Sequence, residues 1–270
     1  MKVFISVVSH DHEELISELG CLAKLANEPN FTVVLKSNKP VSGDNFVKYL
    51  ESNDIHFIDE SHLLGFGENN NYVYDWCVEK LSLTDADYFL ILNPDVYVNV
   101  IDIFELIKAM KSNGNQLSTL NLFRDNKFES YDYCVRTFPS LFDFIRSYIG
   151  LGNKSIIDKR NVNAPLEVDW AAGSFLLFKA SLYNKLEGFD SNYFMYCEDI
   201  DICWRSITLF QEKPVFFPHI RAIHYAQHAN RSIFSKHFFW HLKSMFRYLT
   251  MYYKLRSPLR KKENEKCTKE

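Results

Sequence analysis

The sequence lacks several features that would assign the chain to a particular class of protein. No apolar run approaches the length of a transmembrane helix, and the N-terminal apolar run at 3–8 is too short for a signal peptide. No internal repeat or low-complexity tract is present. The net charge of −3 gives no support for nucleic acid as a partner, although an average can hide local patches.

The six cysteines are scattered along the chain and include no C-x-x-C pair. This spacing is unlike a disulfide framework and favours reduced thiols in a cytoplasmic protein. A zinc site built from Cys197, Cys203 and a nearby histidine is an alternative, but the spacing matches no common zinc site. We therefore expect a cytoplasmic chain without disulfides.

The composition is that of a folded protein with many aromatic side chains. With 270 residues and an apolar fraction of 47%, the chain can form one large domain, or a domain with an appendage, around a sizeable core. The aromatic fraction of 16% is high and suggests a surface that meets an apolar or ring-shaped ligand.

Short apolar runs alternate with helical patterns in the first part of the chain. This β-α-β-α-β order is typical of a parallel nucleotide-binding sheet, so we predict an α/β fold with a mostly parallel central sheet. The expected strands are 3–8, 31–35, 55–58, 88–92, 117–123, 175–178, 214–217 and 221–225, and the first two helices are 13–26 and 46–50.

The strand at 88–92 runs into Asn93-Pro94-Asp95. Pro94 cannot donate to a sheet ladder, so the strand must end there. Asp95 then lies just past the carboxyl end of a central strand, where open α/β sheets place their ligands. A carboxylate at this point can hold a divalent cation against a phosphorylated substrate. Alternatively, Asp95 only caps a turn or the helix that begins near Asp102.

A glycine-containing stretch at 65–71, Gly-Phe-Gly-Glu-Asn-Asn-Asn, precedes a helical pattern that extends to Lys80. Glycines allow a backbone to approach a ligand closely, and a helix N-terminus favours anions. The stretch has neither the full dinucleotide fingerprint nor the Gly-Lys-Ser/Thr of a P-loop. A tight turn with asparagine caps explains the same residues.

Three carboxylates, Glu198, Asp199 and Asp201, open a helix that continues to about residue 209. Acidic residues in a first turn often act as caps or partners of the helix dipole. At 100° per residue the three cannot share one face, so one can face a substrate while the others anchor the helix. Aromatic residues crowd the approach to them, which indicates a pocket.

The C-terminal part of the chain has a different composition. From Ser232 to Lys262 there is no acidic residue, while eight basic residues alternate with aromatic and apolar ones. This is the composition of an interfacial membrane anchor, in which each Lys or Arg contributes roughly 1 kcal/mol near an anionic leaflet. Packing of the helix on the domain, with a basic outer face, is the alternative; RNA binding has no accompanying motif. We predict a domain at 1–230 and an amphipathic, basic, membrane-associating extension at 231–270.

Several motifs follow one another in a specific order. Leu-Asn-Pro-Asp at 92–95 follows the glycine-containing loop, and Asp-Trp-x-x-Gly-Ser-Phe, Tyr-Phe-Met-Tyr-x-Glu-Asp-Ile-Asp and Ala-Ile-His-Tyr come after it. In this order the chain resembles the bacterial inverting glycosyltransferases of the GT-A fold, and most closely the rhamnosyltransferases of O-antigen and cell-wall polysaccharide assembly. The resemblance extends from Val3 to about Tyr248. It includes a segment at 231–244 that is characteristic of the lipid-linked O-antigen enzymes.

The resemblance implies a GT-A, Rossmann-like fold and a reaction. The implied donor is dTDP-β-L-rhamnose, and the implied acceptor is N-acetylglucosamine on undecaprenyl diphosphate, at the cytoplasmic face of the inner membrane. One alternative keeps the fold but takes a UDP-hexose or another dTDP-sugar. Another is a non-catalytic, membrane-associated sugar-binding scaffold, which the presence of Asp95 and Asp199 disfavours. The resemblance sets no oligomeric state.

The resemblance also implies roles for single residues. Asp199 matches the catalytic base, and Asp95 and His224 match ligands of Mg²⁺ or Mn²⁺. Asn93 stands where the family has the first Asp of its metal motif, which leaves fewer carboxylates on the metal. Nucleotide or diphosphate contacts are expected from Ser9, Asn38, Gly67, Asn71 and Asn93, and sugar or acceptor contacts from Trp170, Gly173, Glu198 and Arg231.

Overall fold

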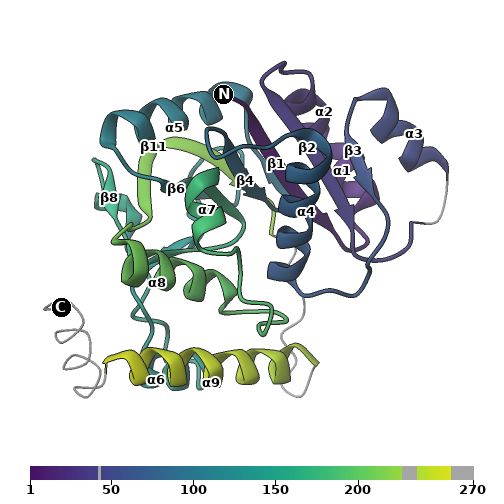
Figure 1. The fold of residues 1–270 in the computed structure, drawn as a ribbon. Coiled ribbons are helices and arrows are strands. Elements are labelled where there is room, and N and C mark those ends of the chain that lie inside the picture. Colours follow the sequence, from purple (N-terminus) through teal and green to yellow (C-terminus); the bar gives the residue numbers. More distant parts are fainter. Residues whose placement is uncertain (42–43, 227–235, 257–270) are drawn as a thin grey trace, which may run out of the picture.

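A curled, nine-stranded sheet runs through the centre of the molecule, with helices on both of its sides (Figure 1). The computed structural model describes residues 1–41, 44–226 and 236–256. The strand order is β3-β2-β1-β4-β10-β6-β11-β5, and β8 pairs with β11. A second sheet, of two strands, pairs β7 with β9.

The first half of the sheet is parallel throughout. Its strands are β1 (Val3–Ser9), β2 (Phe31–Ser37), β3 (His56–Ile58) and β4 (Tyr88–Leu92). The connecting helices are α1 (Glu13–Leu19), α2 (Cys21–Ala26), α3 (Asp44–Ser52) and α4 (Phe66–Leu81). The chain moves outward from β1 to β3 and then returns to form β4 on the other side of β1. This reversal creates the crevice in which doubly wound sheets bind ligands.

The second half mixes strand directions. Its strands are β5 (Val96–Tyr97), β6 (Leu117–Phe123), β7 (Val135–Arg136), β8 (Leu166–Glu167), β9 (Trp170–Ala171), β10 (Phe175–Lys179) and β11 (Val215–His224). Its helices are α5 (Val100–Asn113), α6 (Leu141–Tyr148), the 3₁₀ turn η1 (Lys159–Asn161), α7 (Ala180–Lys185), α8 (Glu198–Phe210) and α9 (Lys236–Arg256). β10 is antiparallel to both β4 and β6, so it joins the two halves of the sheet.

Three predicted elements differ from those observed. The helix expected at 13–26 is divided at Gly20, whose φ of +56° ends α1. The strands expected at 214–217 and 221–225 form one strand, β11, because the register against β6 shifts between Phe217 and Arg221. Pro218 lies within this shift, where its missing N–H interrupts no regular ladder.

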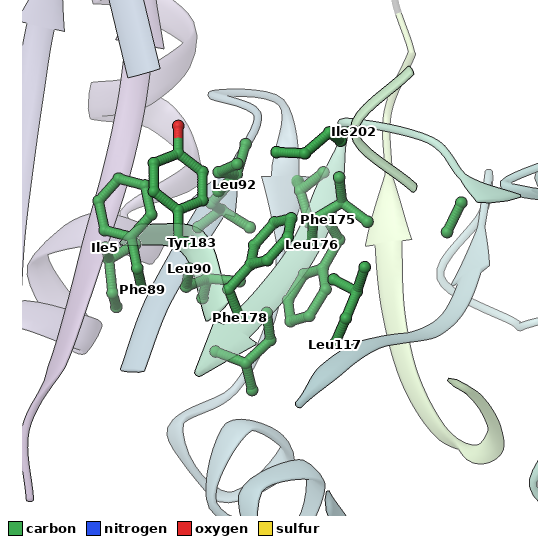
Figure 2. Packing of buried hydrophobic residues seen from close by; sticks show 14 of the residues in the cluster. Ile5, Phe89, Leu90, Leu92, Leu117, Phe175, Leu176, Phe178, Tyr183 and Ile202 are labelled. Carbon is green, nitrogen blue, oxygen red and sulfur yellow. The ribbon is translucent and has the colours of Figure 1, made fainter. Parts of the chain in front are cut away.

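The core is centred on β4 and β10. All five residues of β4 are buried, as expected of a central strand covered on both faces. Figure 2 shows the side chains of Phe89 and Phe178 beside Tyr183 of α7, with ring centroids 4.8 and 5.2 Å from that of Tyr183. Burying side chains of this size contributes about 1.5–3 kcal/mol each. The hydroxyl of Tyr183 donates to Asn71 Oδ1 at 2.7 Å, so this buried polar group is satisfied.

The inner face of α9 packs on the domain. Met245, Tyr248, Leu249 and Tyr252 are buried in the same cluster as the central sheet. For this face, packing on the domain, which was the alternative to a membrane anchor, is what the structure shows. Residues 231–235 and 257–270 of the predicted extension lie outside the described residues. None of the helices within 1–41, 44–226 and 236–256 combines the length and the apolar character that crossing a bilayer requires.

The start of α4 depends on a glycine for close packing. A Cβ atom at Gly67 would lie 2.6 Å from the Cβ of Phe189. We expect Gly67→Ala to lower the free energy of unfolding by about 1–3 kcal/mol, because the added methyl group overpacks this contact. Thermal denaturation should show a Tm lower by about 2–4 °C per kcal/mol. Val78→Ala, at an exposed position of the same helix, is the control and should change little; an unchanged Tm for Gly67→Ala would contradict the packing argument.

Candidate active site

Two predicted metal ligands meet at one edge of the sheet. Asp95 follows β4, and His224 is the last residue of β11. The short strand β5 pairs with the end of β11, which brings His224 opposite Val96. His224 Nε2 therefore lies 3.3 Å from Asp95 Oδ1.

A third residue, Asp132, completes this cluster. It lies in the loop after β6, and its Oδ2 is 3.0 Å from His224 Nδ1. Arg124 lies 3.9 Å from the same carboxylate. The imidazole is thus held between two carboxylates, one on each ring nitrogen. No sequence signal pointed to Asp132, because 92 residues separate it from His224 and its neighbours are polar and aromatic without a motif.

The electrostatics of the cluster favour ionised carboxylates. Burial alone would lower the pKa of His224, but its contacts with Asp132 and Asp95 outweigh burial and raise it to about 9. Burial also opposes ionisation of the two carboxyl groups, yet the same contacts hold their pKa values below the ordinary range. A cation that takes Nε2 of His224 as a ligand must displace the proton there, while Asp132 can keep the proton on Nδ1.

The residues present fit a divalent cation. Asp95 Oδ1 is buried and makes no hydrogen bond of good geometry within the described part of the chain. One carboxylate oxygen and one imidazole nitrogen are a donor set that Mg²⁺ and Mn²⁺ accept. Within the described residues, no group of three or more His, Cys, Asp or Glu side chains is arranged so that all of them could hold one metal ion. Such a site suits an ion that completes its coordination with substrate phosphates and water, as Mg²⁺ commonly does.

The predicted base Asp199 and the predicted sugar-site residue Gly173 are brought together. Asp199 Oδ2 accepts a hydrogen bond from the backbone N–H of Gly173 at 3.3 Å, and Oδ1 accepts one from Ile200 at 2.9 Å. A Cβ atom at Gly173 would lie 2.8 Å from the ring of Phe66 and 3.9 Å from Asp199 Cβ. A glycine is therefore needed where the turn between β9 and β10 approaches both α4 and α8.

Glu198 and Asp199 form an acidic pair, in which Glu198 is buried and Asp199 is half-buried. Glu198 is only 7% exposed, and its Oε2 atom has no hydrogen-bond partner within the described residues. Burial, together with the negative charge of Asp199, raises the pKa of Glu198 well above its ordinary value. Burial also raises the pKa of Asp199, against the opposing hydrogen bonds from Gly173 and Ile200. A carboxylate with a raised pKa is a better proton acceptor, which suits a general base.

A strained turn leads into this acidic pair and is held by α9. Tyr196 and Cys197 have φ values of +72° and +64°, in the left-handed region that non-glycine residues rarely adopt. Ser244 Oγ of α9 donates to the carbonyl of Met195 at 2.8 Å, and the Tyr196 hydroxyl lies 3.0 Å from His237 Nδ1. α9 thus supports the turn from which Asp199 projects.

A backbone hydrogen bond joins the segment that carries Asp95 to the segment that carries Gly173. The N–H of Asn93 donates to the carbonyl of Ser174 at 3.0 Å, where β4 ends and β10 is about to begin. Asn93 is thereby fixed between Asp95 and Gly173. Trp170, on β9, donates from Nε1 to the carbonyl of Thr137 at 2.9 Å.

The predicted nucleotide contacts lie around the ends of β1 and β2 and the start of α4. The backbone of Asn38 bonds to that of Ser9, and the Asn38 amide holds the loop at Leu64 through both of its groups. Asn71 uses its amide in the same way, on the N–H and carbonyl of Phe189. These asparagines stabilise the fold through side chains that were predicted to contact ligand. Arg231 lies outside the described residues.

Comparison with known proteins places the chain in a family. No family model matches it. The rhamnosyltransferase WbbL of Escherichia coli (strain K12) is 42% identical over 252 residues, which are 92% of this chain and 92% of that protein. The chain belongs to the rhamnosyltransferase family of WbbL. An N-acetylglucosaminyl-diphospho-decaprenol L-rhamnosyltransferase of Mycobacterium tuberculosis is 33% identical over 82 residues, 30% of this chain and 26% of that one.

Solved structures agree on the fold. TarS of S. aureus superposes with a TM-score of 0.56 at 12% identity, over 84% of this chain and 37% of that one. A mannosyltransferase from Pyrobaculum calidifontis, solved with GDP-Man and Mn²⁺, gives 0.54 at 13% identity, over 85% and 58%. Both are GT-A glycosyltransferases. The predicted GT-A fold, its mostly parallel central sheet and the assignment to the glycosyltransferases are confirmed.

The buried Glu198 carboxylate gives stability a definite pH dependence. Its folded pKa lies above the ordinary value of 4.5, so the folded state holds the proton more tightly. Stability therefore falls as pH rises from that value through the folded pKa, by at most about 1.4 kcal/mol per pH unit. We expect Glu198→Gln to remove this fall and to unfold at a higher temperature than the wild type at about pH 8, with a smaller difference at about pH 5.

Glu51→Gln, which changes an exposed glutamate of α3, is the matched control and should follow the wild type at both pH values. Thermal denaturation at a series of pH values measures the effect. A Glu198→Gln variant less stable than the wild type at the higher pH would show that the ionised carboxylate is stabilised rather than strained.

Proposed function

We propose that the chain transfers L-rhamnose from dTDP-β-L-rhamnose, with inversion, to N-acetylglucosamine on a polyprenyl diphosphate, in O-antigen or related polysaccharide biosynthesis. The observation that carries this proposal is the 42% identity to a rhamnosyltransferase along 92% of the chain. The activity named for the mycobacterial relative supports the acceptor class, a diphospho-polyprenol that carries N-acetylglucosamine. The rest of the proposal follows from the site.

Asp199 takes the proton in this mechanism. Its raised pKa lets it accept a proton from the acceptor hydroxyl as that oxygen attacks the anomeric carbon. Attack from the face opposite the diphosphate forms the new C–O bond while the bond to dTDP breaks, and the configuration inverts. The N–H of Gly173 orients the carboxylate, and burial keeps its proton affinity high.

Asp95 and His224 would hold a divalent cation beside the leaving diphosphate. When bound, such an ion neutralises the charge that develops on dTDP. Asp132 accepts the Nδ1 proton of His224 and so fixes Nε2 toward Asp95. The Mn²⁺ and GDP-Man in the structure of the Pyrobaculum mannosyltransferase support a metal-assisted reaction.

A lipid-linked acceptor places the enzyme at a membrane surface. The described residues of α9 include no Asp or Glu, and Lys236 and Lys243 are exposed. We propose that the chain binds peripherally to the cytoplasmic face of the inner membrane through this basic helix.

The donor is tested directly with a panel of dTDP-rhamnose, other dTDP-sugars and UDP-hexoses. A short-chain N-acetylglucosaminyl diphosphate lipid serves as acceptor, and mass spectrometry identifies the product. We expect a deoxyhexose to be added from dTDP-rhamnose. Addition of a hexose from a UDP-sugar instead would replace the proposed donor while leaving the fold and the base in place.

Asp199→Asn should lower turnover by about a hundredfold or more, because an amide cannot accept the acceptor's proton. Binding of dTDP, measured by calorimetry, should remain near the wild-type value. Asp85→Asn changes an exposed carboxylate and serves as the control. Full turnover of Asp199→Asn would rule out its assignment as the base.

Asp132→Asn should weaken Mn²⁺ binding in the presence of dTDP by about 10–100-fold, because His224 loses the carboxylate that orients it. Electron paramagnetic resonance of free Mn²⁺ measures this without turnover. Glu129→Gln, an exposed change in the same loop, is the control. Unchanged Mn²⁺ affinity in Asp132→Asn would mean that Asp132 has no part in the metal site.

A further inference from the structure

Exposed apolar side chains are concentrated on α6 and α9. Among the described residues, 10 of the 17 large apolar side chains that are exposed belong to 141–151 or to α9. In α6 and the turn after it, Phe142, Ile145, Ile149 and Leu151 are 65%, 45%, 63% and 59% exposed. Soluble surfaces normally scatter such residues singly, so a cluster of this size indicates a binding surface.

The two helices lie side by side at one end of the molecule (Figure 1). The ring of Phe144, the buried residue of α6, is 6.3 Å from that of Tyr248 on α9. The hydroxyl of Tyr148 is hydrogen-bonded to His241 Nδ1. These contacts join the two helices, so their exposed side chains border the same end of the molecule.

Each outer face has a helical stripe. On α6, Phe142, Ile145 and Ile149 are spaced by three and four residues and so share a face. On α9, exposed side chains recur at the same spacing from Phe239 to Tyr253. This α9 stripe consists of Phe239, Lys243, Phe246, Thr250 and Tyr253, opposite the buried Met245, Tyr248 and Tyr252.

We propose that α6 and α9 together form one lipid-contacting surface, in which the apolar stripe of α6 enters an anionic bilayer beside the aromatic and basic stripe of α9. The role of α6 goes beyond the basic helix of the proposed function, and the proposal rests on that function only for the lipid-linked acceptor. Phenylalanine and isoleucine supply apolar area, and the lysines reach toward anionic headgroups.

The charge of the surface favours a bilayer over a second copy of the chain. Lys154, Lys236 and Lys243 are exposed at this surface. Asp143, the acidic residue of α6, is engaged in a capping box with Ser140. A two-fold dimer through this face would oppose lysine to lysine, because both partners of such an interface present the same patch. An anionic leaflet, by contrast, attracts each of these charges.

The same surface lies next to the turn that carries the candidate base. α9 contacts that turn through Ser244 and Met195, and the ring of Trp240 is 4.8 Å from that of Phe194. Contact of α6 and α9 with a leaflet therefore places the catalytic pair close to headgroup level. A diphosphate-linked sugar, which projects from the leaflet, can then reach Asp199 without leaving its lipid.

Sedimentation of the full chain with vesicles tests the surface. We expect binding to vesicles of phosphatidylglycerol and phosphatidylethanolamine, and weak binding to phosphatidylcholine alone. Phe142→Ser/Ile149→Ser should weaken partition to anionic vesicles by about tenfold or more, since burial of one such side chain changes partition by that factor. Val78→Ser/Ile101→Ser, which changes exposed apolar residues of α4 and α5, is the matched control and should bind as the wild type does.

Lys236→Gln/Lys243→Gln supplies a second variant that leaves the apolar stripe intact. It should weaken binding to anionic vesicles alone, and added salt should weaken the wild type in the same way. Wild-type binding by the folded Phe142→Ser/Ile149→Ser variant would overturn the role of α6. A loss of dimerisation in that variant, with unchanged vesicle binding, would identify the surface as a contact between two copies.

The acceptor separates this proposal from the proposed function. The α6 variant should retain turnover on a water-soluble short-chain acceptor and lose it on an acceptor embedded in vesicles. Equal loss on both acceptors would contradict a role confined to the bilayer. Failure of the wild type to transfer rhamnose to either acceptor would refute the proposed function, while the sedimentation result would still decide the lipid surface.

Discussion

The antiparallel pairing of β10 with β4 is the constraint on which the site depends. It sets Phe175 opposite Leu92, so the chain just before β10 meets the chain just after β4. The hydrogen bond between Asn93 and Ser174 then fixes the two segments, one leading to Asp95 and the other to Gly173. A change of register by one residue would exchange the faces of β10 and would separate the cluster around His224 from Glu198 and Asp199.

Electrostatics give the two groups of carboxylates opposite properties. Asp95 and Asp132 face the imidazole of His224, which keeps them ionised and ready to neutralise a cation. Glu198 is buried and the adjacent Asp199 is half-buried, so each holds a proton more tightly than it would in water. Environments that separate the pKa values of acids also separate the roles open to them, which is why we propose Asp95 as a ligand and Asp199 as the base.

Local patterns predicted most of the fold, and contacts between distant segments account for what they missed. The apolar runs located the strands, and Pro94 located the end of β4, because both effects act within a few residues. Asp132 could not be found in this way, since only the folded sheet brings the loop after β6 to the end of β11. The glycine and asparagine at the start of α4 were predicted to contact nucleotide. In the structure, Gly67 packs against Phe189 and Asn71 is hydrogen-bonded to it. A glycine or asparagine that is needed for such a tertiary contact cannot be told, from sequence alone, from one that contacts a nucleotide.

α9 has two different faces, and only the inner one contacts the domain. Its inner face supports a backbone that is unfavourable by itself, since each of the two left-handed residues, Tyr196 and Cys197, costs roughly 1–3 kcal/mol. Contacts from Ser244 and His237 offset part of that cost and hold the start of α8 where Asp199 meets Gly173. These contacts with the turn show that α9 has a structural role within the domain. The same helix exposes aromatic and basic side chains on its outer face. Displacement of α9 from the domain would therefore also disturb the turn before Asp199, which would link the proposed membrane contact to the proposed base.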